Sequence, residues 1–327
     1  MTEMLDRGEA AITSGEKRRR YLRWGRIAVT IAAVGYLASR VEPRDVLDAF
    51  QRLSAGAALT AIAVVLLGLF CGMVRWRSLL RAYGAIDLPS WPRVAHLYFV
   101  GHFYNTYAPG GVGGDVIRGV AGRKAFGDLD LASATSGVAV VFIERVIGVS
   151  ALLVLATAAY LIQPIPGVEN LEVWAGLGLA AAAAALIGIA LAPRLAPLLP
   201  EKLGKPLRAL PRLYSVGPFL IAIALSLLIH FINIVAGHAI MHSLEPSVTF
   251  AQSAVVMPLI GASAVFPFTV GGAGVREAAF ATLYGTVGVP EASAYAASLS
   301  FWAVQLLTAG IGGVINLLVP LSGRDRE

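Results

Sequence analysis

One glycine- and proline-rich element occurs twice in this chain, and it constrains the fold more than any other feature. The first copy reads NTYAPGGVGGDVIR over residues 105–118, and the second reads VFPFTVGGAGVRE over residues 265–277. A spacing of 158 residues separates Arg118 from Arg276, and the prolines and paired glycines keep the same spacing. Apolar segments that glycine and proline interrupt at matching places in two halves of a chain indicate an internal repeat around a transporter's central site. A chance likeness of two glycine-rich turns is the alternative.

The composition places this repeat in a membrane. Hydrophobic residues make up 57% of the chain and charged residues 14%, and the mean hydropathy is +0.72. Soluble domains contain roughly 45–50% apolar and about 25% charged residues. We therefore predict an all-α polytopic membrane protein. The net charge of +6 lies in short segments beside apolar runs, as topology signals do, which argues against nucleic-acid binding. Cys71 is the only cysteine, so the chain can form no internal disulfide.

Apolar runs and basic loops together predict the topology. Residues 1–23 form a basic tail that we expect in the cytoplasm, residues 24–320 a single transmembrane domain, and residues 321–327 a cytoplasmic C-terminal tail. The basic loop at 194–212 is either a plain topology signal or an amphipathic helix on anionic lipid. About six full spans are predicted. They lie at about 24–39, 54–74, 131–162, 173–191, 218–241 and 292–318.

Neither copy of the repeated element has room for two full spans. In the first copy, the arms at about 91–108 and 115–126 are too short to cross the membrane. The same holds for the second copy, whose first arm lies at about 250–268 and whose return arm follows the turn and ends at about 287. Each copy is therefore predicted to be a re-entrant helical hairpin that turns within the membrane. The charge rule makes the first hairpin enter from the cytoplasm and the second from outside. Repeat 1, about 91–162, and repeat 2, about 249–320, would then form an inverted repeat.

Each turn opens a half-helix whose free N–H groups and dipole favour an anion. Arg118 and Arg276 lie in the first turns of these half-helices. An arginine at the bilayer centre costs at least about 2.5–3.5 kcal/mol. A lipid phosphate would offset this cost, because arginine binds phosphate oxygens bidentately. The predicted substrate-binding residues are Asn105, Gly113, Gly114, Asp115, Arg118, Gly271, Gly272, Gly274, Arg276 and Glu277.

Internal pairing is the alternative for the two arginines. Asp115 is placed to cap its helix and to bond Arg118, and Glu277 stands beside Arg276. Both arrangements could hold in alternating states. The sequence leaves open whether the arginines bind a phosphate or only these carboxylates.

Glu144 and Arg145 place two more charges near the middle of the apolar segment 131–162. Adjacent helix positions point about 100° apart, so the two need not pair with each other, and either could reach a charged residue of the turns. An ionisable residue within the membrane marks function by default, which makes Glu144 a candidate proton relay. The residue equivalent to Glu144 in the second repeat is Trp302, so we expect an asymmetric site.

Other site chemistries have little support in the sequence. His238 and His242 have the i, i+4 spacing of a metal pair, but neither a carboxylate nor a cysteine completes a set nearby. The glycine-rich turns lack the Lys-Ser/Thr of a P-loop, and no nucleophile–base constellation is present. We therefore expect neither a metal nor another cofactor, and we expect that the protein is not an enzyme.

The motifs at residues 105–118, 144–148 and 267–277 resemble those of the lysylphosphatidylglycerol synthase transmembrane-region family, also called the flippase-like family. The resemblance covers roughly residues 25–318. It implies a protein of the bacterial inner membrane that moves a lipid between leaflets. In fused relatives this region precedes a cytosolic domain that transfers an amino acid from tRNA to phosphatidylglycerol. We expect no such domain here, and therefore no aminoacyl transfer.

The leading hypothesis is a lipid flippase or scramblase that hydrolyses no ATP itself. It would bind an anionic phospholipid or a polyprenyl-phosphate-type lipid between Arg118 and Arg276 and expose it to each leaflet by alternating access. One alternative is a non-transporting protein that presents a lipid to a separate glycosyltransferase or lipid synthase. Another is a membrane-embedded transferase.

Overall fold

The computed structural model describes residues 44, 47–48, 51–107, 111–127, 131–164, 171–201, 204, 208, 210–263 and 274–321. Several sequence predictions lie outside these residues: both terminal tails, the span at 24–39, and the second turn with Gly271 and Gly272. Every regular element in the described part is a helix, as the composition predicts.

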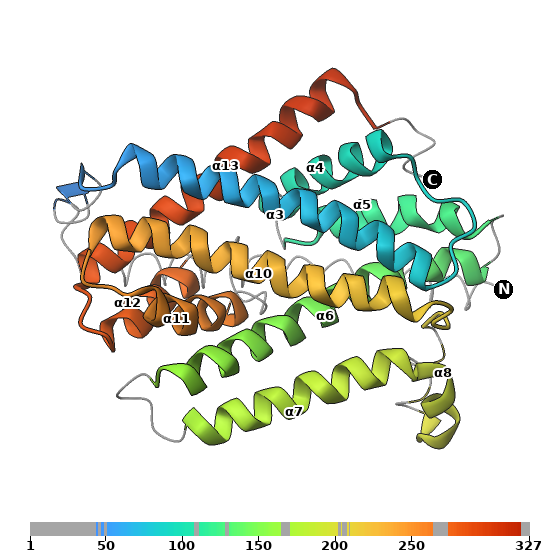
Figure 1. Cartoon of the computed structure of the whole chain (residues 1–327). Coiled ribbons are helices and arrows are strands. Elements are labelled where there is room, and N and C mark those ends of the chain that lie inside the picture. Colours follow the sequence, from blue (N-terminus) through green and yellow to red (C-terminus); the bar gives the residue numbers. More distant parts are fainter. Residues whose placement is uncertain are drawn as a thin grey trace, which may run out of the picture.

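Among the described residues, four helices are long and apolar enough to cross a membrane. They are α3 (Ala55–Ala82), α6 (Leu131–Ile162), α10 (Val216–Leu244) and α13 (Glu291–Leu318), and they run along the molecule in Figure 1. All four match predicted spans. The fifth, predicted at 173–191, corresponds to the shorter apolar helix α7 (Leu171–Ala190).

Four short helices occupy the two repeated elements. The first element forms α4 (Trp91–Tyr107) and α5 (Gly113–Gly122), and the second forms α11 (Phe250–Ser263) and α12 (Val275–Gly285). The longest of them has 17 residues, fewer than the roughly 20 that a helix needs to cross the hydrocarbon core. In Figure 1, α4 and α5 occupy the right-hand part of the bundle, whereas α11 and α12 occupy the left-hand part.

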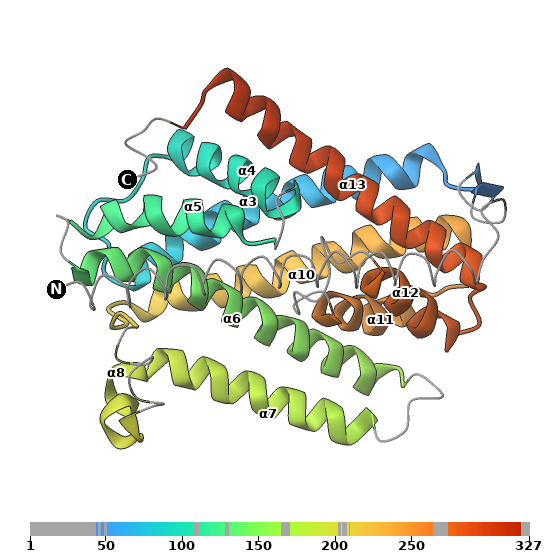
Figure 2. The same ribbon diagram turned by 180° about the vertical axis from the view of Figure 1, so that it is seen from behind.

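The packing of the helices follows one pattern in both halves of the chain. Helix α3 lies along α10, α4 packs against α13, and α11 packs against α6 (Figures 1 and 2). A groove of about 530 Å³ lies between α4 and α13, and a smaller one of about 80 Å³ lies between α6 and α11 beside α7. Ile315 lines the first groove and Thr157 the second, and these residues stand 158 positions apart.

Glycines bring the short helix α5 into backbone contact with both neighbours. A Cβ atom on Gly114 would lie 1.8 Å from the carbonyl oxygen of Gly101 in α4. A Cβ atom on Gly137 of α6 would lie 2.3 Å from the carbonyl oxygen of Gly119 in α5. Small residues allow this close approach of helices in membranes. Side chains on α5 are therefore held at short range from both α4 and α6.

Candidate functional site

Asn105, near the end of α4, fixes the start of α5 from across the hairpin. Its Oδ1 accepts hydrogen bonds from the backbone N–H groups of Gly114 at 2.8 Å and Asp115 at 3.2 Å. Its Nδ2 donates to Asp115 Oδ1 at 3.0 Å. The N-cap residue of α5, Val112, has no side chain that can accept such bonds. Asn105 thus satisfies free N–H groups of the helix start that an anion would otherwise bind.

Arg118 projects from α5 into a buried pair of carboxylates. Its Nη2 lies 2.8 Å from Asp115 Oδ1, and its Nη1 lies 2.8 Å from Glu144 Oε2 on α6. The guanidinium also faces the rings of Tyr98, at 4.7 Å, and Trp76, at 5.9 Å. Only 7% of the Arg118 side chain is exposed. Internal pairing, one of the two sequence hypotheses for this arginine, is therefore present in this conformation.

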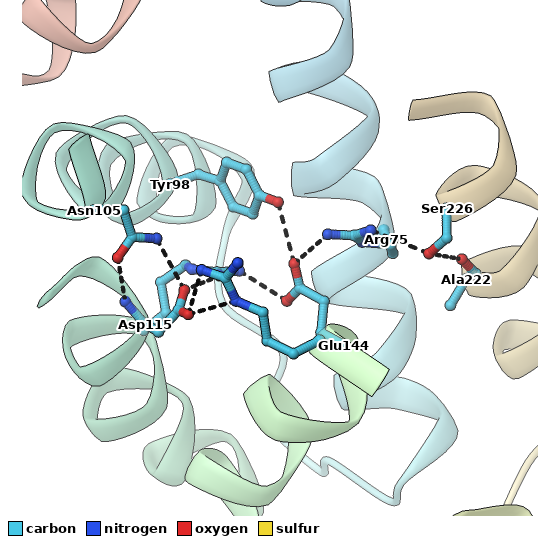
Figure 3. Close-up of polar contacts among 9 residues, drawn as sticks. Arg75, Tyr98, Asn105, Asp115, Glu144, Ala222 and Ser226 are labelled. Carbon is cyan, nitrogen blue, oxygen red and sulfur yellow. Dashed lines mark hydrogen bonds and ion pairs between the residues drawn. The ribbon is translucent and has the colours of Figure 1, made fainter. Parts of the chain in front are cut away.

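A second arginine, Arg75 of α3, holds the other oxygen of Glu144. Figure 3 shows Arg75 and Tyr98 converging on this carboxylate from α3 and α4. Arg75 Nη2 lies 2.6 Å from Glu144 Oε1, and the Tyr98 hydroxyl donates to the same oxygen at 3.3 Å. Arg75 Nη1 also donates to Ser226 Oγ on α10 at 3.1 Å. Arg75 thus connects the carboxylate of Glu144 in the first half of the chain to α10 in the second half.

Arg145 is the accessible member of the cluster. Its Nε donates to Asp115 Oδ2 at 2.7 Å, and its Nη2 lies 2.6 Å from the same oxygen. The Arg145 side chain is 58% exposed, whereas the Glu144 side chain beside it in sequence is 3% exposed. The two neighbours therefore point in different directions, as their adjacent helix positions predict.

The cluster carries one excess positive charge. It combines three guanidinium groups with two carboxylates, and its charged members are Arg75, Asp115, Glu144, Arg118 and Arg145. In addition, the buried Nε of Arg75 and Nε1 of Trp76 have no hydrogen-bond partner. Charged groups and hydrogen-bond donors are stabilised most by a partner where water is excluded. The arrangement therefore favours binding of an anion at this cluster.

The second copy of the element has a smaller arrangement. Gly274, at φ 87°, is the N-cap residue of α12, and its N–H donates to Glu277 Oε2 at 2.6 Å. Arg276 bonds Glu277 Oε1 through Nε and Nη2, and its Nε also donates to Ser298 Oγ at 3.2 Å. The Arg276 guanidinium faces the Trp302 ring at 5.2 Å. This arginine is therefore also paired internally.

The two arginines face residues at equivalent positions. Arg118 contacts Glu144 on α6, and Arg276 contacts Trp302 on α13. Arg276 lies 158 residues after Arg118, and Trp302 lies 158 residues after Glu144. The long helix thus supplies a carboxylate in the first half and an aromatic ring in the second. The second half takes its carboxylate from Glu277, on the short helix itself. The asymmetry expected from the sequence is present in these contacts.

The described contacts divide the predicted site residues into two groups. Asn105, Gly114, Asp115, Arg118, Glu144 and Arg145 form the first, and Gly113 lies next to it as the first residue of α5. Gly274, Arg276 and Glu277 form the second. The hydrogen bonds and ion pairs described for Arg118 and for Arg276 share no partner. In this conformation each arginine is bound within its own hairpin and long helix.

Sequence reasoning missed three members of the first group: Arg75, Tyr98 and Ser226. Arg75, which lies just beyond the span predicted at 54–74, is not among the predicted site residues. A usable signal was nevertheless present, because the residue 158 positions further on is Asn233, a polar residue within an apolar helix. Polar residues at matched positions of two repeats indicate a shared path. Tyr98 carried no comparable signal, since its counterpart is Val256.

Comparison with known families decides the identity of the chain. The family described as lysylphosphatidylglycerol synthase TM region matches residues 23–313. The chain belongs to this family. Both arginine groups lie inside the matched region, and together with the apolar helices the family match makes this a multi-pass membrane protein. No curated protein matches the sequence.

Proposed function

We propose that this family member is a lipid flippase or scramblase. It would bind the phosphate of an anionic phospholipid or a polyprenyl-phosphate-type lipid and move it between leaflets without hydrolysing ATP. One observation carries the proposal: a charge cluster with four largely buried members and one accessible, excess arginine lies where two short helices meet inside a membrane protein. We propose no chemical reaction for the protein.

The arrangement of the helices supports an inverted repeat. The order of one long, two short and one long helix occurs as α3 to α6 and again as α10 to α13. The short helices of the two halves lie toward opposite ends of the bundle (Figures 1 and 2). We therefore propose that α4–α5 and α11–α12 are re-entrant hairpins that enter from opposite sides of the bacterial inner membrane. The basic loops place both termini in the cytoplasm under this proposal.

The internal ion pairs support transport by exchange of partners. An arginine that leaves a carboxylate for a phosphate keeps a charged hydrogen bond throughout, so neither state exposes an unpaired charge to the low-dielectric interior. Arg118 and Glu144 would hold the closed arrangement when no lipid is bound. Rocking of one helical half against the other would expose the cluster to each leaflet in turn.

The proposal predicts that Arg118→Ala abolishes transbilayer movement of a fluorescent anionic phospholipid in proteoliposomes. Glu144→Gln should reduce it at least tenfold, because the closed arrangement loses the carboxylate that pairs with two arginines. Arg81→Gln is the matched control, since Arg81 is exposed at the end of α3, away from this cluster.

Unchanged movement in Arg118→Ala would remove the site assignment. A wild-type protein that retains lipid but moves none would instead be a presenting partner for a separate glycosyltransferase or lipid synthase. Measurable chemical conversion of the lipid would make it a transferase.

A further inference from the structure

We propose that Arg145 is the residue that takes the lipid phosphate, and that the cluster selects a singly charged phosphodiester over a phosphomonoester. This inference rests on the proposed function and specifies its substrate class. The juxtaposition that carries it is one exposed guanidinium on Asp115, beside a buried set of charges that is neutral without it.

The cluster without Arg145 has equal numbers of opposite charges. Arg75 and Arg118 balance Asp115 and Glu144. Both oxygens of Glu144 are held by these two arginines, and Asp115 Oδ1 is held by Arg118 and by the amide of Asn105. Departure of Arg145 would free a single carboxylate oxygen, Asp115 Oδ2. Arg145 is therefore the member that can leave at the lowest cost.

Accessibility distinguishes the same residue. The side chain of Arg145 is 58% exposed, against 7% for Arg118 and 12% for Arg75. A ligand can reach Arg145 without opening the packing around Trp76 and Tyr98. An accessible arginine near the middle of an apolar helix is costly in a membrane unless it faces a polar ligand or cavity.

The charge balance specifies the ligand. One spare guanidinium forms a bidentate pair with one phosphate and neutralises a phosphodiester, which carries a single negative charge. A phosphomonoester carries about −1.5 to −2 charges near neutral pH. Its additional charge would stand beside the Asp115 carboxylate without a partner, which is unfavourable where water is excluded. A zwitterionic lipid would bring a cation toward a site that already holds one in excess.

The test is lipid retention by the purified full-length protein, measured by native mass spectrometry after incubation with equimolar phosphatidylglycerol, phosphatidic acid and phosphatidylcholine. We expect the wild type to retain phosphatidylglycerol at least roughly tenfold over the other two, the scale of one charged hydrogen-bonded pair. Arg145→Gln should abolish this preference, and Arg145→Lys should restore part of it. Arg194→Gln, at an exposed position in the helix α8 (Ala192–Leu195), is the control.

A second variant separates selection from folding. Asp115→Asn removes a competitor for Arg145 and raises the excess charge of the cluster from one to two. We expect it to bind more phosphatidic acid than the wild type, a gain that a misfolded protein would not show. Soluble glycerophosphoglycerol at millimolar concentration should not displace the lipid, because the acyl chains contribute to binding; displacement would point to a headgroup or free-phosphate site.

Equal retention of phosphatidic acid by the wild type would overturn the inference, as would an unchanged preference in Arg145→Gln. The binding readout requires no transport. If the lipid preference depends on Arg145 but no lipid crosses the bilayer, the inference stands and the proposed transport function fails. If lipid crosses but neither binding nor movement depends on Arg145, the inference alone fails.

Discussion

At the scale of single residues, Glu144 holds the first cluster together. Its two oxygens accept from Arg75, Tyr98 and Arg118, so a carboxylate that is 3% exposed balances two buried guanidinium groups. A proton relay needs a carboxylate that can release its partners, whereas Glu144 in this conformation is held from both sides. The proton-relay prediction from the sequence stays a prediction for another conformation.

This pairing predicts a specific stability effect. Glu144→Gln leaves Arg75 and Arg118 facing each other across an uncharged amide, and removal of one partner of a buried ion pair costs about 3–5 kcal/mol. We expect a lower midpoint in thermal unfolding of the purified protein in detergent. The double variant Arg75→Gln/Glu144→Gln should recover part of the loss, since it removes the surplus charge. A midpoint equal to that of the wild type in Glu144→Gln would contradict the described pairing.

At the scale of elements, the helices were easier to predict than the contacts between them. The first arm, predicted at 91–108, is α4 at Trp91–Tyr107, and the second long helix agrees at both ends with the predicted 131–162. Such helix boundaries can be predicted from the nearby sequence, because they follow from its hydropathy and from glycines that interrupt a helix. The partners of Glu144 come from three other helices, and no local pattern specifies how long helices rotate about their axes. For this reason Arg118–Asp115, an i, i+3 pair, was foreseen and Arg75–Glu144 was not.

The glycines of the first turn have a structural role that the sequence interpretation did not include. It counted Gly113 and Gly114 among the substrate-binding residues, whereas in the structure Gly114 allows close approach of α4 to α5. The prediction is that Gly114→Ala forces the hairpin arms apart, because the new Cβ would lie 1.8 Å from a backbone oxygen of Gly101. We expect the free energy of unfolding to fall by about 3 kcal/mol, the upper end of the usual cost of overpacking.

Thermal unfolding and lipid retention of Gly114→Ala are the measurements for this hairpin. Gly310→Ala in α13 is the matched control, because nothing lies within 4 Å of its added Cβ. If both variants unfold at the wild-type midpoint, the backbone contact between α4 and α5 is not as described.

At the scale of the whole molecule, the order of helices and the packing pattern both follow the spacing of the sequence repeat. The spacing between two short motifs was enough to predict that each half has two short helices between two long ones. The sequence left open whether the two arginines bind a phosphate or pair separately with their own carboxylates, and in this structure they pair separately. Such pairing depends on how the long helices are rotated and packed, and the repeated motifs alone do not specify this.

The proposed opposite orientation of the two hairpins predicts that cysteines before α4 and before α11 are labelled from opposite sides of the membrane. Ser90 is exposed just before α4, and Ser247 is exposed just before α11. In intact cells, a membrane-impermeant maleimide should label Ser247→Cys and spare Ser90→Cys, and inside-out vesicles should give the reverse. The wild-type chain should remain unlabelled, since its single cysteine, Cys71, is only 6% exposed. Labelling of both positions from the same side would exclude the inverted arrangement.

The exchange of Glu144 for Trp302 across the repeat makes the two arginine groups chemically unequal, so the proposed transport would hold a lipid headgroup differently at each of them. Under the proposed function, a phosphate at the first group would lie near a formal anion on the long helix, Glu144. A phosphate at Arg276 would meet an aromatic face there and find its rival carboxylate on the adjacent residue, Glu277. Residence times should therefore differ between the two faces of the bilayer, although the net flux of a passive carrier still follows the lipid gradient. The proposed inverted repeat would therefore present chemically different sites to the two sides of the membrane.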